Sequence, residues 1–341
     1  MAATLKQIAE AAGVSRGTVD RVLHGRGHVN PELEERVSRL LKEMGYQPNR
    51  LGRGLVMSGR AIKLGMICQF SETPFMKLVL NGAEEARTEL KAMNTELYIE
   101  SIDSYDADRM LATIDQMLER GVHGLALTPG NSPAIHEKMR QVIQTGVPIV
   151  TLNSDAPDTG RLAYVGLDNY RAGRAAAGLM SLALRDGGTL LPLSGYTENT
   201  SHTQRMKGFF DAVEHEFPKL RLLDLKHCYD VDAIAEKIVD NALKDCPELA
   251  GIYISGNGQT GVCRALRRFQ KAGKVCVLCF DLTQGNVAEL EKGSLDFILD
   301  QNAGAQGYRP AMLLYDKLLL GEEPSSEYLY TDICIKTRFN L

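Results

Sequence analysis

The sequence contains no tryptophan, and aromatic residues make up only 6% of its 341 residues. Long apolar runs are missing as well: none approaches the roughly 20 residues that a membrane-spanning helix needs. The first residues also lack the apolar core of a secretion signal. We therefore expect a cytoplasmic protein without a membrane segment.

Motifs of catalysis are equally scarce. The seven histidines form no Ser/His/Asp set and no metal-ligand cluster with recognisable spacing. The string Asp186-Gly187-Gly188-Thr189 has the wrong spacing for a phosphate-binding loop and precedes a strand instead of following one. Cys276 and Cys279 lie inside KVCVLCFD, where a buried strand is a better explanation than a redox or zinc site. We predict no catalytic residue, no metal and no cofactor.

Positive charge is concentrated at the start of the chain. Residues 1–60 hold 10 of the 39 Lys and Arg residues but only 6 of the 43 Asp and Glu residues, so the remainder of the chain is acidic. A basic head on an acidic body is the charge distribution expected when only the head touches nucleic-acid phosphates. The length allows a small domain followed by a large or divided one.

The first 25 residues are typical of a helix, a glycine turn and a second helix. Thr4 is placed to cap the first helix, Gly13 interrupts the apolar pattern, and Ser15 is placed to cap the second helix. Apolar residues recur at helical spacing on one face of each segment. The second helix then presents these residues outward: Arg16, Gly17, Thr18, Asp20 and Arg21. A recognition helix that enters the major groove of DNA has this arrangement, although small helical hairpins also occur outside DNA binding.

The next stretch narrows the choice. Asn30 is placed to cap a third helix with Pro31 at its first position, and Gly45 ends it. The run T-L-x-x-I-A-x-x-A-G-V-S-x-x-T-V-x-R-V-L, the third helix, and G-Y-x-P-N-x-x-G-R-x-L together resemble the lactose-repressor family of transcription factors. This resemblance implies a DNA-binding headpiece over residues 1–45 and a hinge segment over residues 46–60.

The same resemblance implies how the hinge segment acts. In the family it forms a short helix only on DNA, and a leucine, here Leu55, wedges into the minor groove. Gly52 and Gly54 together disfavour a helix by roughly 2 kcal/mol relative to alanine, so we expect the helix to form only with operator and partner present. A plain flexible linker is the alternative.

Base recognition is expected to depend mainly on two arginines of the second helix. Arg16 and Arg21 can donate to guanine edges, whereas Gly17 leaves one contact position without a side chain. Asp20 stands where most members have serine, and we favour a role in orienting Arg21 over a direct contact with cytosine. The residues expected to serve phosphates and the minor groove are Asn49, Arg50 and Arg53.

From residue 62 onward, short apolar runs alternate with amphipathic helices, which indicates parallel sheets covered by helices. The order repeats once, so we predict an α/β core of two doubly wound lobes. Together with the headpiece, this core resembles the periplasmic-binding-protein fold found in the lactose-repressor family. We expect the core to span residues 61–341. The first lobe is expected over about 61–163 and 293–341, and the second over about 164–292, with crossovers.

Polar residues at strand ends are the candidate ligand contacts, because open α/β sheets bind ligands beyond the carboxyl ends of their strands. Phe70, Ser71 and Phe75 follow the first strand, and Asn153 and Asp155 follow the fourth. Aromatic rings suit the C–H faces of sugars, although each phenylalanine could equally pack the core. Further along the chain, this type of position is occupied by Arg205, Asn257, Asp281 and Gln301.

These last four residues match the motifs of ribose-type sugar-binding proteins, which implies a sugar-like effector. The departure lies at Asp155, which that pattern places directly before an arginine; here the loop continues with alanine and proline. The resemblance therefore names no particular sugar.

The function that follows is regulation by linkage. We expect a homodimer that binds a palindromic operator and whose operator affinity changes when the effector closes the cleft. Repression relieved by ligand is what the family implies, with a ligand-dependent activator or a corepressor-type regulator as alternatives. A sugar-responsive enzyme and a transport receptor are the rival classes. The sequence has no apolar heptad repeat after the last strand, so nothing in it predicts a coiled-coil tetramer. On its operator the protein would be associated with the nucleoid.

Overall fold

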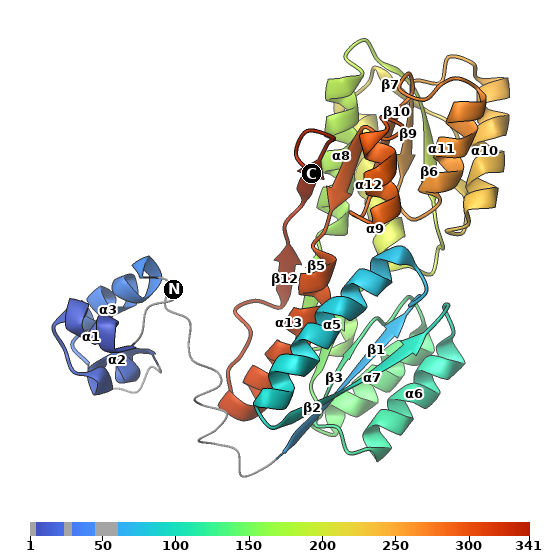
Figure 1. Ribbon diagram of the computed structural model, residues 1–341. Coiled ribbons are helices and arrows are strands. Elements are labelled where there is room, and N and C mark those ends of the chain that lie inside the picture. Colours follow the sequence, from blue (N-terminus) through green and yellow to red (C-terminus); the bar gives the residue numbers. More distant parts are fainter. Residues whose placement is uncertain (1–4, 24–28, 45–60) are drawn as a thin grey trace. The chain divides into compact units, whose positions relative to one another are not determined.

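The computed structural model describes residues 5–23, 29–44 and 61–341 (Figure 1). Contacts divide the chain into two compact units, Met1–Ser58 and Gly59–Leu341. The first unit contains the helices α1 (Leu5–Ala12), α2 (Arg16–Leu23) and α3 (Pro31–Glu43). Their small core consists of Ile8, Ala9, Ala12, Val19 and Val37. The predicted three-helix headpiece is therefore present.

The first lobe of the core has a six-stranded parallel sheet. Its strands lie in the order β12 (Tyr328–Thr331), β5 (Ala163–Leu167), β4 (Ile149–Leu152), β3 (Gly124–Leu127), β1 (Ile62–Gln69) and β2 (Thr95–Ile102). One face is covered by α5 (Pro74–Ala92) and α13 (Ala303–Tyr315), and the other by α6 (Ala107–Glu119) and α7 (Pro133–Gln144) (Figure 1). Fully buried strands such as β3 and β4 explain the continuous apolar runs.

The second lobe repeats this plan. Its sheet has the order β13 (Cys334–Lys336), β11 (Phe297–Asp300), β10 (Cys276–Phe280), β9 (Gly251–Ile254), β6 (Gly188–Ser194) and β7 (Leu220–Leu222), and β8 (Lys226–His227) also pairs with β6. The helices α8 (Asn169–Ala183) and α9 (Thr200–Glu216) cover one face. The other face is covered by α10 (Asp232–Asp245), α11 (Gln259–Arg268) and α12 (Gln284–Glu291). Only β13 runs antiparallel to its neighbour in this sheet.

The chain crosses between the lobes near Asp168, near Gln301 and at residues 332–333. These crossings correct the expected lobe boundaries. Strand β5, expected in the second lobe, pairs with β4 in the first, and β11, expected in the first, lies in the second. The last apolar run is divided, with β12 in one sheet and β13 in the other. A buried strand has the same apolar pattern in either sheet, so the pattern could not assign these strands.

Local signals explain where most helices begin. Thr73, Asp106, Ser132 and Thr283 each accept a hydrogen bond from a backbone N–H in the first turn of the helix that follows. Two glycines allow α8 and α9 to pack closely: a Cβ on Gly208 would overlap the carbonyl oxygen of Tyr170, and one on Gly173 would overlap that of Arg205. The backbone of Arg205 therefore lies at this close contact between the two helices.

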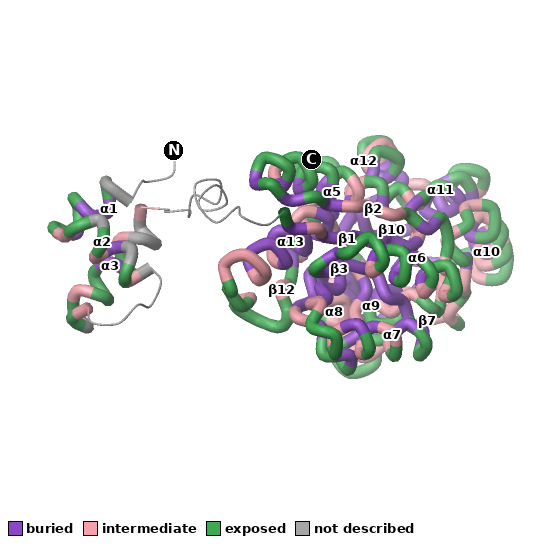
Figure 2. Tube along the Cα trace, turned by 90° about the horizontal axis from the view of Figure 1, so that it is seen from below, coloured by how far each residue is buried: buried purple, intermediate pink, exposed green. Residues whose placement is uncertain are grey.

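Burial follows the same layers. Figure 2 shows buried residues along the strands and the inner faces of the helices of the core, and exposed residues on their outer faces. Among the residues that the structure describes, no helix is long and apolar enough to cross a membrane.

Candidate functional site

Two predicted helix caps of the headpiece are present in the structure. Ser15 accepts a hydrogen bond from the Thr18 N–H (3.1 Å), and Asn30 accepts one from the Glu32 N–H (2.9 Å), so both act as helix caps. Gly17 and Arg21 are exposed, and the Arg21 Nε donates to the Gly17 carbonyl (3.2 Å). The side chains of Arg16 and Asp20, and the residues Thr4, Asn49, Arg50, Arg53 and Leu55, lie outside what the structure describes.

A cavity between the two lobes brings most of the candidate ligand contacts together. The predicted residues that line it are Phe70, Phe75, Asn153, Arg205, Asn257, Asp281 and Gln301. It is also lined by residues that the sequence analysis missed: Thr73, Met76, Asn199, Ser201, His202 and Asp230. Residues scattered over more than 200 positions therefore converge on one space.

Two predicted contacts lie elsewhere. Ser71 does not line the cavity; its hydroxyl donates to Asp103 (3.4 Å). The Asp155 carboxylate accepts hydrogen bonds from Thr151 (2.6 Å) and from the buried Arg161 (2.6 Å to Nη2). A 3₁₀ turn at Pro157–Thr159 lies between Asp155 and Arg161, so the Asp–Arg pair of the ribose-type pattern exists in space but not in sequence, and neither residue lines the cavity.

Arg205 is the main cation of the cavity, and its side chain is almost wholly buried. It donates to Asn169 Oδ1 (2.8 Å) and to the Ser255 carbonyl (3.0 Å), and its guanidinium lies 3.9 Å from the centre of the Phe280 ring. Burial lowers the pKa of Arg205 below its usual value, while Asp281 opposes that shift. Its orientation is thus fixed by protein groups alone.

Asp281 and Gln301 form a second polar pair. The Gln301 amide donates to Asp281 Oδ1 (2.6 Å), and Gln306 in turn donates to the Gln301 carbonyl (2.9 Å). Burial raises the pKa of Asp281 to about 6, although Arg205 and the Gln301 hydrogen bond both oppose this. The carboxyl therefore titrates near neutral pH.

His202 and Asp230 meet at the glycines that follow β6 and β9. A Cβ on Gly195 would overlap both the Asp230 carboxylate and His202 Nδ1, and a Cβ on Gly256 would overlap Asp230. Asp230 Oδ1 accepts from the Asn257 N–H (2.7 Å). Burial lowers the pKa of His202 to about 4 despite the nearby Asp230, so the imidazole is neutral at physiological pH.

The backbone at the cavity is unusual. Phe70, Asn153, Asp230 and Asp281 have φ angles of 58°, 62°, 59° and 77°. Residues other than glycine rarely adopt this left-handed conformation, and such strain tends to collect at functional sites. The backbone geometry therefore marks the cavity independently of its side chains.

The two lobes contact each other around the cavity. Ser201 of α9 donates to the Asn153 carbonyl (2.8 Å), and the Asn131 N–H donates to the Glu198 carbonyl (3.1 Å). The ring centres of Phe70 and Tyr196 lie 5.8 Å apart across the same boundary. A ligand in the cavity would be enclosed by both lobes.

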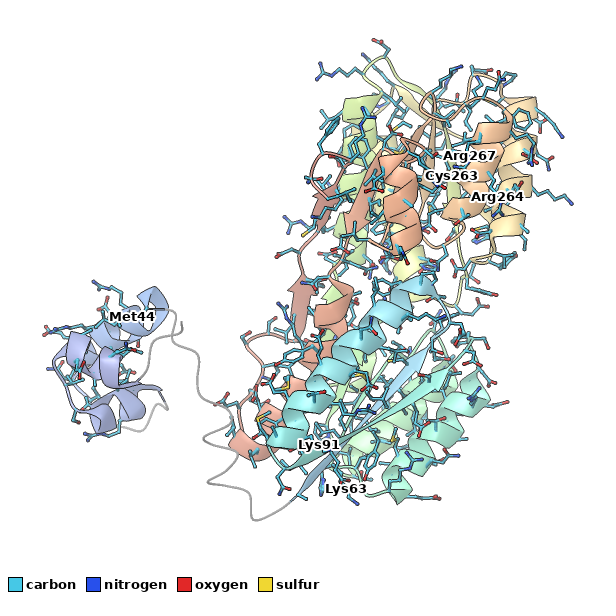
Figure 3. The ribbon with its side chains drawn as sticks, in the orientation of Figure 1. Met44, Lys63, Lys91, Cys263, Arg264 and Arg267 are labelled. Carbon is cyan, nitrogen blue, oxygen red and sulfur yellow. The ribbon has the colours of Figure 1, made fainter. Side chains whose placement is uncertain are left out.

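Two arginines of the second lobe outside the cavity are held by acidic partners. Arg264 and Arg267, labelled on α11 in Figure 3, pair with Glu236 (2.8 Å) and Glu289 respectively. In the part of the chain that is described, no three His, Cys, Asp or Glu side chains gather where they could hold a metal ion. Cys276 and Cys279 lie on β10, as expected, and burial raises the pKa of both thiols.

Comparison with known proteins adds relatives to this geometry. The chain is 29% identical over 177 residues to catabolite control protein A of Staphylococcus epidermidis, which covers 52% of this chain and about half (51%) of that protein. It is 24% identical over 272 residues to the ribose import binding protein RbsB of Escherichia coli, covering 78% and 87% of the two chains. A solute-binding protein from Burkholderia graminis, solved with D-arabinose, superimposes with a TM-score of 0.76 at 23% identity over 82% of this chain and 96% of that one.

Two family profiles account for nearly the whole sequence. Residues 4–49 match the bacterial regulatory proteins of the lacI family, and residues 64–323 match the periplasmic binding protein domain. Regulators of this family bind DNA and are not enzymes, which confirms the prediction of a non-enzymatic protein. The predicted combination of headpiece and two-lobed core is likewise confirmed: the chain belongs to the periplasmic-binding-protein domain family, and its residues 4–49 match the lacI family of bacterial regulatory proteins.

Proposed function

We propose that this protein is a sequence-specific transcription regulator whose affinity for its operator is changed by a neutral monosaccharide or polyol bound between the lobes. The observation that carries the proposal is the presence, in one chain, of a lacI-family headpiece and a two-lobed core with a polar interlobe cavity.

The cavity favours a polyhydroxylated ligand. Amides, carboxylates, a guanidinium and a hydroxyl supply donors and acceptors, and Phe70 and Phe75 supply apolar surface for C–H groups. One relative is named for ribose and another was solved with D-arabinose, and both support a sugar-like ligand.

Charge disfavours a phosphorylated sugar. Arg205 is the only Lys or Arg side chain that lines the described cavity, and it faces two carboxylates, Asp230 and Asp281. A phosphate would carry about two further negative charges into this space. We therefore propose an uncharged ligand.

The mechanism we propose is linkage between lobe closure and DNA affinity. A ligand that contacts both lobes stabilises the closed arrangement, and this bias passes to the headpiece through the hinge segment 46–60. The coupling energy is the same in both directions, so operator DNA must change ligand affinity by the same factor. Repression relieved by the ligand is the form we propose first; activation and corepression are the alternatives.

The finer assignments are proposals as well. A homodimer would present two headpieces to a palindromic operator in the cytoplasm, at the nucleoid. In each headpiece, α2 would read the major groove through Arg16 and Arg21, with Ser15, Gly17, Thr18 and Asp20 beside them. The remaining contacts with DNA would come from Thr4, Asn30, Asn49, Arg50, Arg53 and Leu55.

A thermal-shift screen of the full-length protein tests the ligand assignment. The panel contains free pentoses, hexoses, polyols and inositols, together with the phosphates of the same sugars. A ligand at 100 times its dissociation constant stabilises the folded state by about 2.7 kcal/mol, so a true ligand raises the melting temperature measurably. We expect a hit among the free compounds and none among the phosphates.

Operator affinity is then measured on DNA selected by the protein from a random duplex pool. The hit should change that affinity, and the operator should change the affinity for the hit by the same factor. Stabilisation by phosphates alone would contradict the neutral-ligand assignment, and a ligand without effect on DNA affinity would contradict the regulatory mechanism.

A further inference from the structure

The Nδ1 atom of His202 is buried at the cavity and takes part in none of the contacts described so far. His202 is 6% exposed and lines the cavity. A weak interaction with the Tyr196 backbone raises the pKa of the ring slightly, but within the described chain no hydrogen bond of ordinary geometry reaches Nδ1. Leaving a buried donor or acceptor unpaired is unfavourable, which makes this nitrogen a candidate for a ligand contact.

The surrounding contacts determine which ring nitrogen carries the proton. Asn199 Oδ1 accepts from the Ser201 N–H (3.0 Å), so its amide nitrogen faces His202 Nε2 at 3.3 Å. An amide nitrogen can only donate, and Nε2 must therefore accept. Because burial keeps the imidazole neutral, its single proton lies on Nδ1, which becomes a buried donor.

An acceptor stands beside this donor without bonding to it. The Asp230 carboxylate and His202 Nδ1 both lie against the Cα of Gly195, yet no hydrogen bond joins them. Among the described residues, Asp230 has no ion-pair partner within 4 Å, and one of its oxygens accepts from the Asn257 N–H. The carboxylate can therefore accept one more proton donor.

Among the groups of a neutral sugar or polyol, the hydroxyl satisfies both neighbours at once. A hydroxyl oxygen can accept from Nδ1–H while its own proton is donated to Asp230. An ammonium group can donate but cannot accept, and a phosphate or carboxylate can accept but is repelled by Asp230. We propose that His202 and Asp230 together bind one hydroxyl of the effector and determine specificity for it. This inference rests on the proposed function, because it names the chemistry of the same cavity.

The sequence places the pair where it can act on a ligand that Arg205 also holds. His202 lies three residues before Arg205 in α9, so both side chains project from the same face of the helix. Asp230 comes from the loop after β8 in a left-handed backbone conformation that directs it to the same place.

The test uses the full-length protein and monodeoxy derivatives of whichever free sugar or polyol in the screen binds it, with affinity measured by calorimetry. One monodeoxy derivative should bind the unaltered protein at least tenfold more weakly than the parent compound.

The variants test which residues cause this difference. In His202→Leu and Asp230→Leu, the parent compound and that derivative should bind within about twofold of each other. His202→Asn should restore discrimination, because its amide N–H stands about where Nδ1–H stood. His215→Leu, on the same helix but exposed, is the matched control.

Every outcome decides between the proposals. If the sugar binds but its deoxy derivatives are discriminated equally by His202→Leu and by the unaltered protein, the role of His202 is wrong and the proposed function stands. If no member of the panel binds, both proposals fail. Nitrogen NMR of the imidazole supplies a ligand-free check, since a proton on Nε2 of His202 instead of Nδ1 would overturn this inference alone.

Discussion

The two lobes contribute opposite chemistry to one cavity. From the first lobe come Phe70, Thr73, Phe75, Met76 and Asn153, none of which ionises. Every ionisable group of the cavity, namely His202, Arg205, Asp230 and Asp281, comes from the second lobe. The wall from the first lobe is uncharged and largely apolar, whereas the wall from the second lobe, the polar wall, carries all the ionisable groups, although the two sheets share the same plan.

The polar wall is also held in place before any ligand arrives. Arg205 is fixed by Asn169, Ser255 and Phe280, and Asp281 is held by Gln301. Polar groups that are held in place discriminate between ligands, because a ligand that lacks the complementary donor or acceptor leaves these groups buried without a hydrogen bond. The second lobe should therefore select the ligand, and the first should mainly add contact area on closure.

Arg205→Leu should have the largest effect on binding. It removes the cation that faces Asp281 and should weaken binding of the effector about a hundredfold, since a buried charged hydrogen bond contributes about 1.5–3 kcal/mol. Calorimetry with the hit from the screen measures the loss. Arg174→Leu removes an exposed ion pair with Glu216 on the same helix pair and should leave affinity unchanged. A loss below threefold for Arg205→Leu would mean that the polar wall does not hold the ligand.

Asp281 and His202 should affect the pH dependence of the free energy of unfolding in opposite directions. The pKa of Asp281 is raised from 3.8 to about 6, so the native state binds its proton more tightly than the unfolded chain, and this group's stabilisation is lost as pH rises from about 4 to about 6. The pKa of His202 is lowered from 6.5 to about 4, so its contribution to stability increases over the same interval.

The two trends oppose each other in the unaltered protein. Relative to the unaltered protein, Asp281→Asn should make the free energy of unfolding rise by about 2 kcal/mol more between pH 4 and 6, and His202→Asn should make it rise by about 2 kcal/mol less. Urea unfolding at a series of pH values measures both slopes. Parallel pH profiles in the two variants would contradict the assigned pKa shifts.

Most of the fold could be predicted because its signals are local. Continuous apolar runs and amphipathic patterns located nearly every strand and helix of the core, and polar residues directly after strands located Asn257, Asp281 and Gln301. The assignment of β5 and β11 to a sheet was wrong, because it depends on which sheet offers a free edge, and a buried strand carries no sequence mark of that.

The missed site residues have a physical explanation too. The amphipathic pattern around Arg205 predicts a helix from residue 203, but α9 begins at Thr200, and the three additional residues place His202 on the face of Arg205. The apolar run over residues 220–228, just before Asp230, predicts one strand, but the structure divides it into β7 and β8. Small shifts of element boundaries therefore hid half of the polar wall.

Gly208→Ala should destabilise the framework behind the polar wall. A Cβ there would overlap the Tyr170 carbonyl, so α8 and α9 must move apart, at a cost of about 2 kcal/mol. Gly178→Ala in α8 is the matched control: the nearest atom lies 3.9 Å away, and alanine should stabilise the helix by about 0.5–1 kcal/mol. Equal melting temperatures for the two variants would contradict the close packing of these helices.

Phe70→Ala should have the smallest effect and a different character. The ring lies 5.8 Å from Tyr196 of the opposite lobe and 6.2 Å from Tyr105, so its loss removes contact area without unpairing a polar group. Aromatic contacts of this kind contribute about 0.5–1.5 kcal/mol, which predicts binding about threefold to tenfold weaker. The loss should be the same for the parent sugar and all its monodeoxy derivatives, and Tyr98→Ala, outside the cavity, should cause none. A loss that depends on which hydroxyl is missing would show that the first lobe selects the ligand as well, and the division of roles between the walls would be wrong.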